Sequence, residues 1–100
     1  MCSDQKLRVR SYGPRRAELI QQRLDELRAA EALEDIRRIP GPRCHELKQN
    51  RQGQLSVDLD HPYRLLFEPA NDPVPRTPDG GLDWSQVNAV RILEVINTHE

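Results

Sequence analysis

Apolar residues recur at helical spacing in residues 14–39. One stripe has its members at positions i, i+4 and i+7: Ile20, Leu24 and Leu27. A second stripe follows at similar spacing: Ala29, Leu33 and Ile36. Such spacing places apolar side chains on one face of a helix, and Pro14 suits a first helical position because proline has no N–H to leave unbonded there. The pattern therefore predicts two helices packed as a hairpin, with a break near residues 29–31 and an end at Pro40-Gly41-Pro42.

After residue 42 the apolar period shortens to two residues, which is the period of a strand. Two runs alternate in this way, at residues 55–59 (LSVDL) and 63–67 (YRLLF). The turn residues Asp60-His61-Pro62 lie between the runs, so together they predict a β-hairpin. In the first run the aliphatic side chains point to one face of the strand, and Ser56 and Asp58 point to the other.

The remaining segments complete a small domain. Residues 87–96 (VNAVRILEVI) are rich in β-branched side chains and predict a central strand, and residues 6–10 (KLRVR) predict a short edge strand. Residues 69–81 hold four of the eight prolines and two of the five glycines, which predicts a loop excursion over residues 69–86. We expect an α+β fold in one domain, residues 1–100, with an N-terminal helical hairpin packed on a small twisted antiparallel β-sheet.

Composition and charge narrow the possible functions. The chain of 100 residues suits one domain. No apolar run approaches the roughly 18 residues of a membrane span, so we expect a cytoplasmic protein with no membrane partner, in which Cys2 and Cys44 are free thiols. No Cys/His spacing suggests a metal site, and no cofactor is indicated. The net charge is −1, but residues 1–43 carry +3 and residues 44–100 carry −4, which leaves room for a local basic patch.

A basic cluster precedes the predicted hairpin. His45, Lys48 and Arg51 lie close together in the sequence, and Arg64 follows in the second strand of the hairpin. An imidazole with a pKa of roughly 6.5 can accept or donate a proton at neutral pH, and a guanidinium binds phosphate oxygens in pairs. The same residues also fit a solvated strand end, and Arg64 also fits a cross-strand ion pair with Asp58 or Glu68. On residue types alone, both interpretations stay open.

Three segments together resemble the RelE/ParE superfamily of type II toxins, and within it the HigB branch. The segments cover about half the chain: residues 27–48 (LRAAEALEDIRRIPGPRCHELK), 50–67 (NRQGQLSVDLDHPYRLLF) and 87–100 (VNAVRILEVINTHE). Their order is the order of that family: a helical hairpin, a leucine-lysine segment, Arg-x-Gly-Gln, a strand with an arginine after an aromatic residue, and a last strand ending near a histidine.

The resemblance implies a ribosome-dependent mRNA endonuclease that needs neither metal nor cofactor. A ribose 2′-OH would attack the adjacent phosphorus and leave a 2′,3′-cyclic phosphate. The family pattern implies these catalytic residues: His45, Lys48 and His99. It also implies these residues for binding the phosphate and the RNA: Arg51, Arg64 and Asn97. The implied partners are mRNA on the ribosome and a HigA-like helix-turn-helix antitoxin that neutralises the toxin.

The chain departs from the family pattern near its last strand. Asn97-Thr98 precedes His99, where the family often has Asp-Tyr. Asparagine cannot hold an imidazolium by charge, and threonine cannot stack on a base as tyrosine does. The departure favours a second interpretation, a member without nuclease activity that binds its antitoxin or inhibits DNA gyrase as ParE toxins do. A third, that the chain is the antitoxin itself, would require a helix-turn-helix pattern that the sequence lacks.

Overall fold

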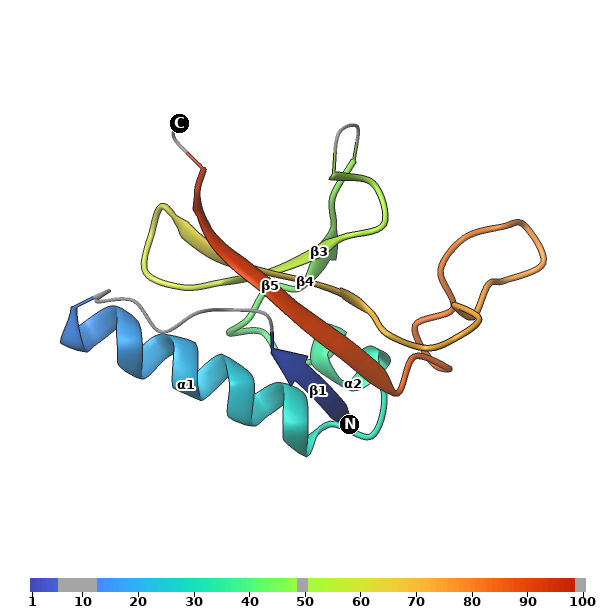
Figure 1. Ribbon diagram of the computed structural model, residues 1–100, viewed down its shortest axis with the longest axis horizontal. Coiled ribbons are helices and arrows are strands. Elements are labelled where there is room, and N and C mark those ends of the chain that lie inside the picture. The colour runs from blue at the N-terminus through green and yellow to red at the C-terminus, as the bar shows by residue number, and fades with distance from the viewer. Residues whose placement is uncertain (6–12, 49–50, 99–100) are drawn as a thin grey trace.

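The computed structural model describes residues 1–5, 13–48 and 51–98 (Figure 1). The elements follow one another in this order: β1 (Cys2–Gln5), α1 (Pro14–Ala29), α2 (Leu33–Arg37), β2 (His45–Glu46), β3 (Leu55–Asp58), β4 (Tyr63–Pro69) and β5 (Ala89–Asn97). This arrangement confirms the α+β class. The edge strand predicted at residues 6–10 lies entirely outside the described residues, and the strand described nearest to it is β1.

The five strands form one sheet in the order β1-β5-β4-β3-β2. The β2–β3, β3–β4 and β4–β5 pairs are antiparallel, as the sequence predicts. β1 instead pairs with β5 in parallel, with Cys2 beside Ala89 and Gln5 beside Ile92. The sheet is therefore mixed, which differs in this detail from the antiparallel sheet expected. β5 lies inside the sheet, between β1 and β4, as a central strand should.

The two helices differ in length. α1 begins at Pro14, as predicted, and the preceding Gly13 has a φ of 84°, a left-handed conformation that glycine adopts at little cost. α2 has five residues, so the predicted helical hairpin is present in a shortened form. Two N–H groups at the start of α2 donate to carbonyls of the loop before β5: Leu33 to Val87 (2.9 Å) and Glu34 to Trp84 (3.1 Å). These bonds satisfy groups that the start of any helix leaves unpaired.

The core lies between the helices and one face of the sheet. It contains Leu27, Leu33 and Ile36 on the helical side, each at most 1% exposed. The sheet contributes these buried residues: Leu55, Val57, Leu65, Phe67, Val90 and Ile92. In Figure 1 strands β3, β4 and β5 cross above α1 and α2, so the helices cover one face. We call the opposite face the open face, and it carries the residues of the candidate site.

A β-bulge changes the pairing of β4 with β5. Leu66 pairs with Glu94 and Phe67 pairs with Ile92, so Leu93 is the extra residue on β5. A bulge of this kind reorients the side chains on one side of it. Phe67 and Ile92 both point into the core, whereas Leu66 and Glu94 are opposed on the other face. The bulge therefore places the Glu94 carboxylate on the open face.

The loop between β4 and β5 is fastened to the body at both ends. The Asn71 side-chain oxygen accepts hydrogen bonds from the backbone N–H groups of Asn88 and Ala89 (3.2 Å each), and its Nδ2 donates to the Asn88 side chain (2.9 Å). Trp84 is 6% exposed. Its Nε1 donates to Glu46 Oε1 of β2 (3.0 Å) and its ring stacks under the Arg37 guanidinium (3.9 Å). These contacts hold the excursion predicted at residues 69–86 against α2 and β2.

We predict that Asp60→Asn lowers the thermal stability at neutral pH, and that its effect disappears in acid. Arg16 of α1 binds Asp60 through two hydrogen bonds of 3.0 Å, and its guanidinium lies 3.6 Å from the centre of the Tyr63 ring. The hydrogen bond from Arg16 holds the pKa of Asp60 below its ordinary value of 3.8. A carboxylate with a lowered folded-state pKa stabilises the fold above its ordinary pKa and loses that contribution as the pH falls through the folded value.

Melting curves of both proteins between pH 3 and 7 check this prediction. The Tm difference between Asp60→Asn and the unchanged chain should be largest above pH 5 and should shrink below about pH 4. Glu18→Gln is the matched control, because Glu18 is an exposed carboxylate on α1, the helix that carries Arg16. A Tm difference that persists unchanged at pH 3 would contradict the assigned role of the Arg16–Asp60 pair.

Candidate functional site

The open face brings His45 and Arg64 together from β2 and β4. β3 lies between them, with His45 paired beside Ser56 and Asp58 paired beside Arg64. Because side chains alternate along a strand, Ser56 and Asp58 point to the open face, as the sequence predicts. We call this set the charged patch: Arg43, His45, Ser56, Asp58 and Arg64.

Arg64 is the centre of the charged patch. Its Nη1 is hydrogen-bonded to His45 Nε2 and lies 3.3 Å from Ser56 Oγ, and its Nε lies 3.4 Å from Asp58 Oδ1. The ion pair with Asp58 that sequence reasoning considered is thus present, while Glu68 pairs with Arg91 instead (3.1 Å). The guanidinium is held by three neighbours and its side chain is still 26% exposed. An anion can therefore reach it from the open face.

The hydrogen bonds of His45 assign its tautomer. Nδ1 lies 2.9 Å from the Arg43 carbonyl oxygen, and a carbonyl oxygen can only accept, so Nδ1 carries the hydrogen. Nε2 then holds the lone pair and accepts from Arg64. Arg43 has a φ of 48°, a conformation that few non-glycine residues adopt. The basic nitrogen of the imidazole is therefore directed toward the Arg64 guanidinium.

The Asp58 carboxylate lies between two arginines, and the Asp58 backbone is hydrogen-bonded to Arg23 and to Pro42. Its Oδ2 lies 3.6 Å from Arg43 Nε, and its Oδ1 faces Arg64. From α1 the buried Arg23 donates to the Asp58 carbonyl oxygen (2.6 Å), and the Asp58 N–H donates to Pro42 (2.7 Å). With one carboxylate between two guanidinium groups and a neutral imidazole, the charged patch has a net positive charge. It is suited to attract an anion.

Lys48 and Arg51 lie at the connection between β2 and β3, beside the charged patch. Lys48 is exposed. Arg51 reaches across to β5, where its Nη2 lies 3.7 Å from Glu94 Oε1. Arg51 and residues 94–98 line a cleft of about 550 Å³. Sequence reasoning predicted Arg51 as a phosphate ligand, and the structure gives it an acidic partner from the neighbouring strand.

Asn97 and Thr98 lie in the same cleft at the end of β5. Asn97 pairs with Tyr63 across the β4–β5 ladder. The Thr98 N–H and hydroxyl both donate to the Pro62 carbonyl (3.0 and 2.8 Å). Thr98, which stands where the family often has tyrosine, therefore fastens the end of β5 to the β3–β4 turn. His99 lies outside the described residues.

Three further polar residues were missed as site residues by sequence reasoning: Arg43, Ser56 and Glu94. The alternation in residues 55–59 already placed Ser56 on the face of Asp58, so a signal existed for it. The sequence held no such signal for Glu94, because the orientation of its side chain depends on the bulge at Leu93. Arg43 enters the site through its backbone carbonyl and its ion pair with Asp58, and the sequence offered no signal for either contact.

Cys44, the neighbour of His45 in the sequence, does not add a charged side chain to the patch. Burial raises the pKa of its thiol to about 12, so the thiol stays protonated at neutral pH and is a poor nucleophile. Cys2 and Cys44 are both free cysteines, as expected. Within residues 1–5, 13–48 and 51–98, no group of three His, Cys, Asp or Glu side chains is arranged to hold a metal ion. None of the helices described has the length and hydrophobicity needed to cross a membrane.

The chain matches a known protein family. The family described as the RelE-like toxin of type II toxin-antitoxin system HigB matches residues 3–77, a span that contains all of β1 except Cys2, strands β2 to β4, both helices and the whole charged patch. The protein is therefore a RelE-like toxin of a type II toxin-antitoxin system. Within that class the chain belongs to the HigB-like toxin family, and such a toxin has an antitoxin as its partner. Comparisons with curated proteins and with solved structures give no significant match.

Proposed function

We propose that the protein is an endoribonuclease that cleaves mRNA on the ribosome in the cytoplasm. The observation that carries this proposal is the contact between His45 Nε2 and Arg64 Nη1 on the open face. A group that can take a proton lies beside a group that can bind a phosphate. RNA cleavage without a metal requires that juxtaposition, because one phosphodiester needs proton transfer and charge neutralisation at the same place.

The proposed reaction forms one bond and breaks one. The ribose 2′-oxygen bonds to the adjacent phosphorus while its proton passes to a base, and the 5′-oxygen leaves with a proton from an acid. The products are a 2′,3′-cyclic phosphate and a free 5′-hydroxyl. We assign proton transfer to His45, Lys48 and His99, and the binding of phosphate and RNA to Arg51, Arg64 and Asn97.

The contacts of Arg64 suggest how the site responds to substrate. In the absence of RNA, Arg64 donates to the same imidazole nitrogen that must accept a proton. A phosphate oxygen is a better acceptor for a guanidinium than a neutral imidazole, because a charged acceptor strengthens the hydrogen bond. Binding of the phosphate would therefore draw Arg64 away and leave His45 Nε2 free to act as a base.

A second candidate function is inhibition of a protein target, such as DNA gyrase, or binding of the antitoxin alone. Two observations favour it. Arg51 and Arg64 both have carboxylate partners, Glu94 and Asp58, so a structural role accounts for both arginines. Thr98 is also engaged by Pro62, where a stacking aromatic residue would serve RNA binding better.

Induced expression of the chain without antitoxin distinguishes these functions. We expect growth arrest together with new 5′ ends on translated mRNA at codon-linked positions. Growth arrest without new 5′ ends would favour a gyrase-type target. The absence of both would contradict the nuclease. Co-expression of a HigA-like helix-turn-helix antitoxin, the partner we propose, should suppress the growth arrest.

A further inference from the structure

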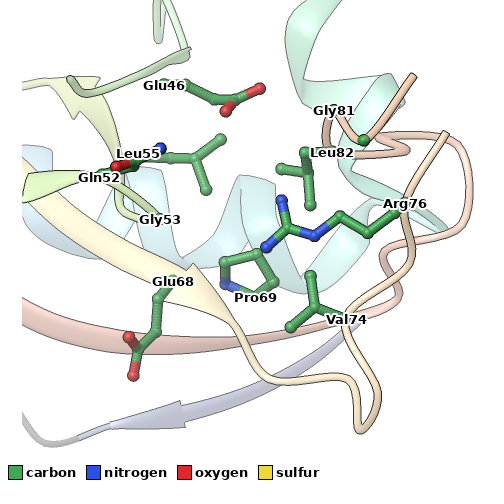
Figure 2. A pocket seen from close by; sticks show the side chains of 11 residues that line it. Glu46, Gln52, Gly53, Leu55, Glu68, Pro69, Val74, Arg76, Gly81 and Leu82 are labelled. Carbon is green, nitrogen blue, oxygen red and sulfur yellow. The ribbon is translucent and has the colours of Figure 1, made fainter.

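A second cleft lies beside the hairpin of β2 and β3, apart from the charged patch. Its volume is about 510 Å³, within the range of roughly 300–1,000 Å³ that small-ligand sites occupy. One wall consists of the β2–β3 hairpin and the end of β4, and the other consists of the loop at residues 74–82. Figure 2 shows the Arg76 guanidinium reaching into this cleft between Leu82 and Pro69.

The wall that carries Arg76 is an ordered structure. Arg76 pairs with Leu82 in an isolated antiparallel bridge. Below it the Thr77 N–H donates to Gly81 (2.8 Å), and Asp79 accepts hydrogen bonds from the Thr77 hydroxyl and the Gly81 N–H. The loop therefore presents Arg76 from a defined backbone. Residues 78–86 lie beyond the segment that the family comparison matches.

The charged groups of the cleft are not paired with one another. Glu46 is bonded through Oε1 to Trp84, and Glu68 through Oε1 to Arg91. Among the residues that the structure describes, the Arg76 guanidinium has no hydrogen-bond or ion-pair partner, and the second oxygen of each carboxylate has none either. Figure 2 shows the Glu68 carboxylate turned away from Arg76, so the cleft offers a ligand one planar cation, Arg76, and one acceptor group, the second oxygen of Glu46.

This combination selects a class of ligand. The Glu46 carboxylate repels a phosphate and offsets the charge of Arg76, so the cleft is poorly suited to the backbone of a nucleic acid. The edges of cytosine and adenine carry amino donors that carboxylates accept, and the flat face of a base stacks on a guanidinium. Pro69, Val74 and Leu82 supply apolar surface around Arg76. A single unstacked base with an exocyclic amino group satisfies all three kinds of lining.

We propose that this cleft binds one nucleobase of a single-stranded RNA, with its face on Arg76 and its amino group toward Glu46. The proposal rests on the proposed function in that the strand would be the mRNA. Glu68 lies four residues beyond Arg64 on the same face of β4, a separation of roughly 13 Å along the strand. A nearby nucleotide of a strand held at Arg64 can therefore supply the base. The cleft would contribute to the sequence preference of cleavage.

Binding of labelled hexacytidylate and hexauridylate, measured by fluorescence anisotropy without ribosomes, tests the proposal. Cytosine and uracil have the same ring size, but only cytosine carries an exocyclic amino group. We expect the unchanged chain to prefer the cytidine oligonucleotide. Arg76→Ala should weaken its binding by about tenfold through loss of stacking. Arg76→Lys should weaken it similarly, because an ammonium keeps the charge but not the plane.

Glu46→Gln tests the acceptor. Glutamine still accepts from Trp84 but can present an amide donor to the cleft, so the preference for cytidine over uridine should shrink or reverse. Arg38→Ala is the control for loss of one positive charge, since Arg38 is exposed at the end of α2, and it should change the cytidine-to-uridine ratio little.

Four results would overturn the proposal: no binding, no preference for cytidine in the unchanged chain, an unchanged affinity in Arg76→Ala, or full recovery in Arg76→Lys. The last would identify a phosphate site. Cytidine preference in a chain that cleaves no mRNA would support the base site and contradict the nuclease. Cleavage of mRNA, together with an oligonucleotide affinity that Arg76→Ala does not change, would support the nuclease and contradict the base site.

Discussion

Replacing Arg64 with alanine should lower the rate of mRNA cleavage by about 10²–10³-fold, the usual effect of removing one charge-stabilising donor from an active site. Arg64 is the guanidinium in contact with His45, so its loss removes the proposed phosphate ligand from beside the proposed base. The fold should change little. Asp58 keeps Arg43 as a partner, and a partly exposed ion pair contributes at most about 1 kcal/mol.

The test compares cleavage rates on translated mRNA and melting temperatures for Arg64→Ala, Arg64→Lys and Arg38→Ala. Lysine keeps the charge but has one nitrogen, whereas Arg64 contacts His45 and Ser56 through Nη1 and Asp58 through Nε, so we expect Arg64→Lys to retain only a small part of the activity. Arg38→Ala should cleave normally. If Arg64→Ala cleaved at the full rate, Arg64 would have to be removed from the site and its pairing with Asp58 would be structural.

Replacing Trp84 with alanine should lower the free energy of unfolding by about 3–5 kcal/mol, as large-to-small changes of buried aromatic residues do. Trp84 is almost fully buried where the long loop meets α2 and β2. The change leaves a cavity, removes the ring beneath Arg37 and leaves Glu46 without its donor. A domain of this size has a total stability of about 5–15 kcal/mol, so the variant should be close to unfolded at physiological temperature.

Urea unfolding followed by far-ultraviolet circular dichroism measures this effect. Tryptophan fluorescence cannot serve for the variant, because Trp84 is the chain's single tryptophan. Trp84→Phe keeps most of the packing and loses only the Nε1 hydrogen bond, so it should cost about 1 kcal/mol. An Ala variant as stable as the Phe variant would show that the loop is not coupled to the core.

Local sequence patterns predicted those helices and strands that bury one face of their side chains in the core. The helical stripe through Leu24 and Leu27 and the alternation in residues 55–67 each reflect burial of one face, and burial is encoded locally. β1 carries no such pattern, because CSDQ pairs with β5 through its backbone at the other end of the chain. The local pattern predicted a helix through Leu33 and Ile36 but not its length of five residues, and the N–H groups at its start are bonded to the distant loop residues Val87 and Trp84.

In the candidate site, too, local patterns predicted some features, and contacts between distant segments determine the others. Alternation predicted that Arg64 faces away from the core, and this is enough to bring it beside Asp58. The hydrogen bond to His45 depends on the register of β2 with β3, which no sequence pattern fixed. The partner of Arg51 depends on the bulge in β5. Arg76 was treated as part of a loop, because a proline-rich segment gives no periodicity from which its orientation can be derived.

The parallel pairing of β1 with β5 has a consequence for how the chain folds during synthesis. Among the described strands β1 is synthesised before the other four and its neighbour β5 after them, so the pair cannot form until β5 has been synthesised. β4 also waits for β5, its partner in the longest ladder of the sheet. Contacts between such distant residues slow folding, because a large loop must close before they form. The five-stranded sheet is therefore completed only after β5 has been synthesised, and a nascent chain that stops before residue 89 cannot complete it.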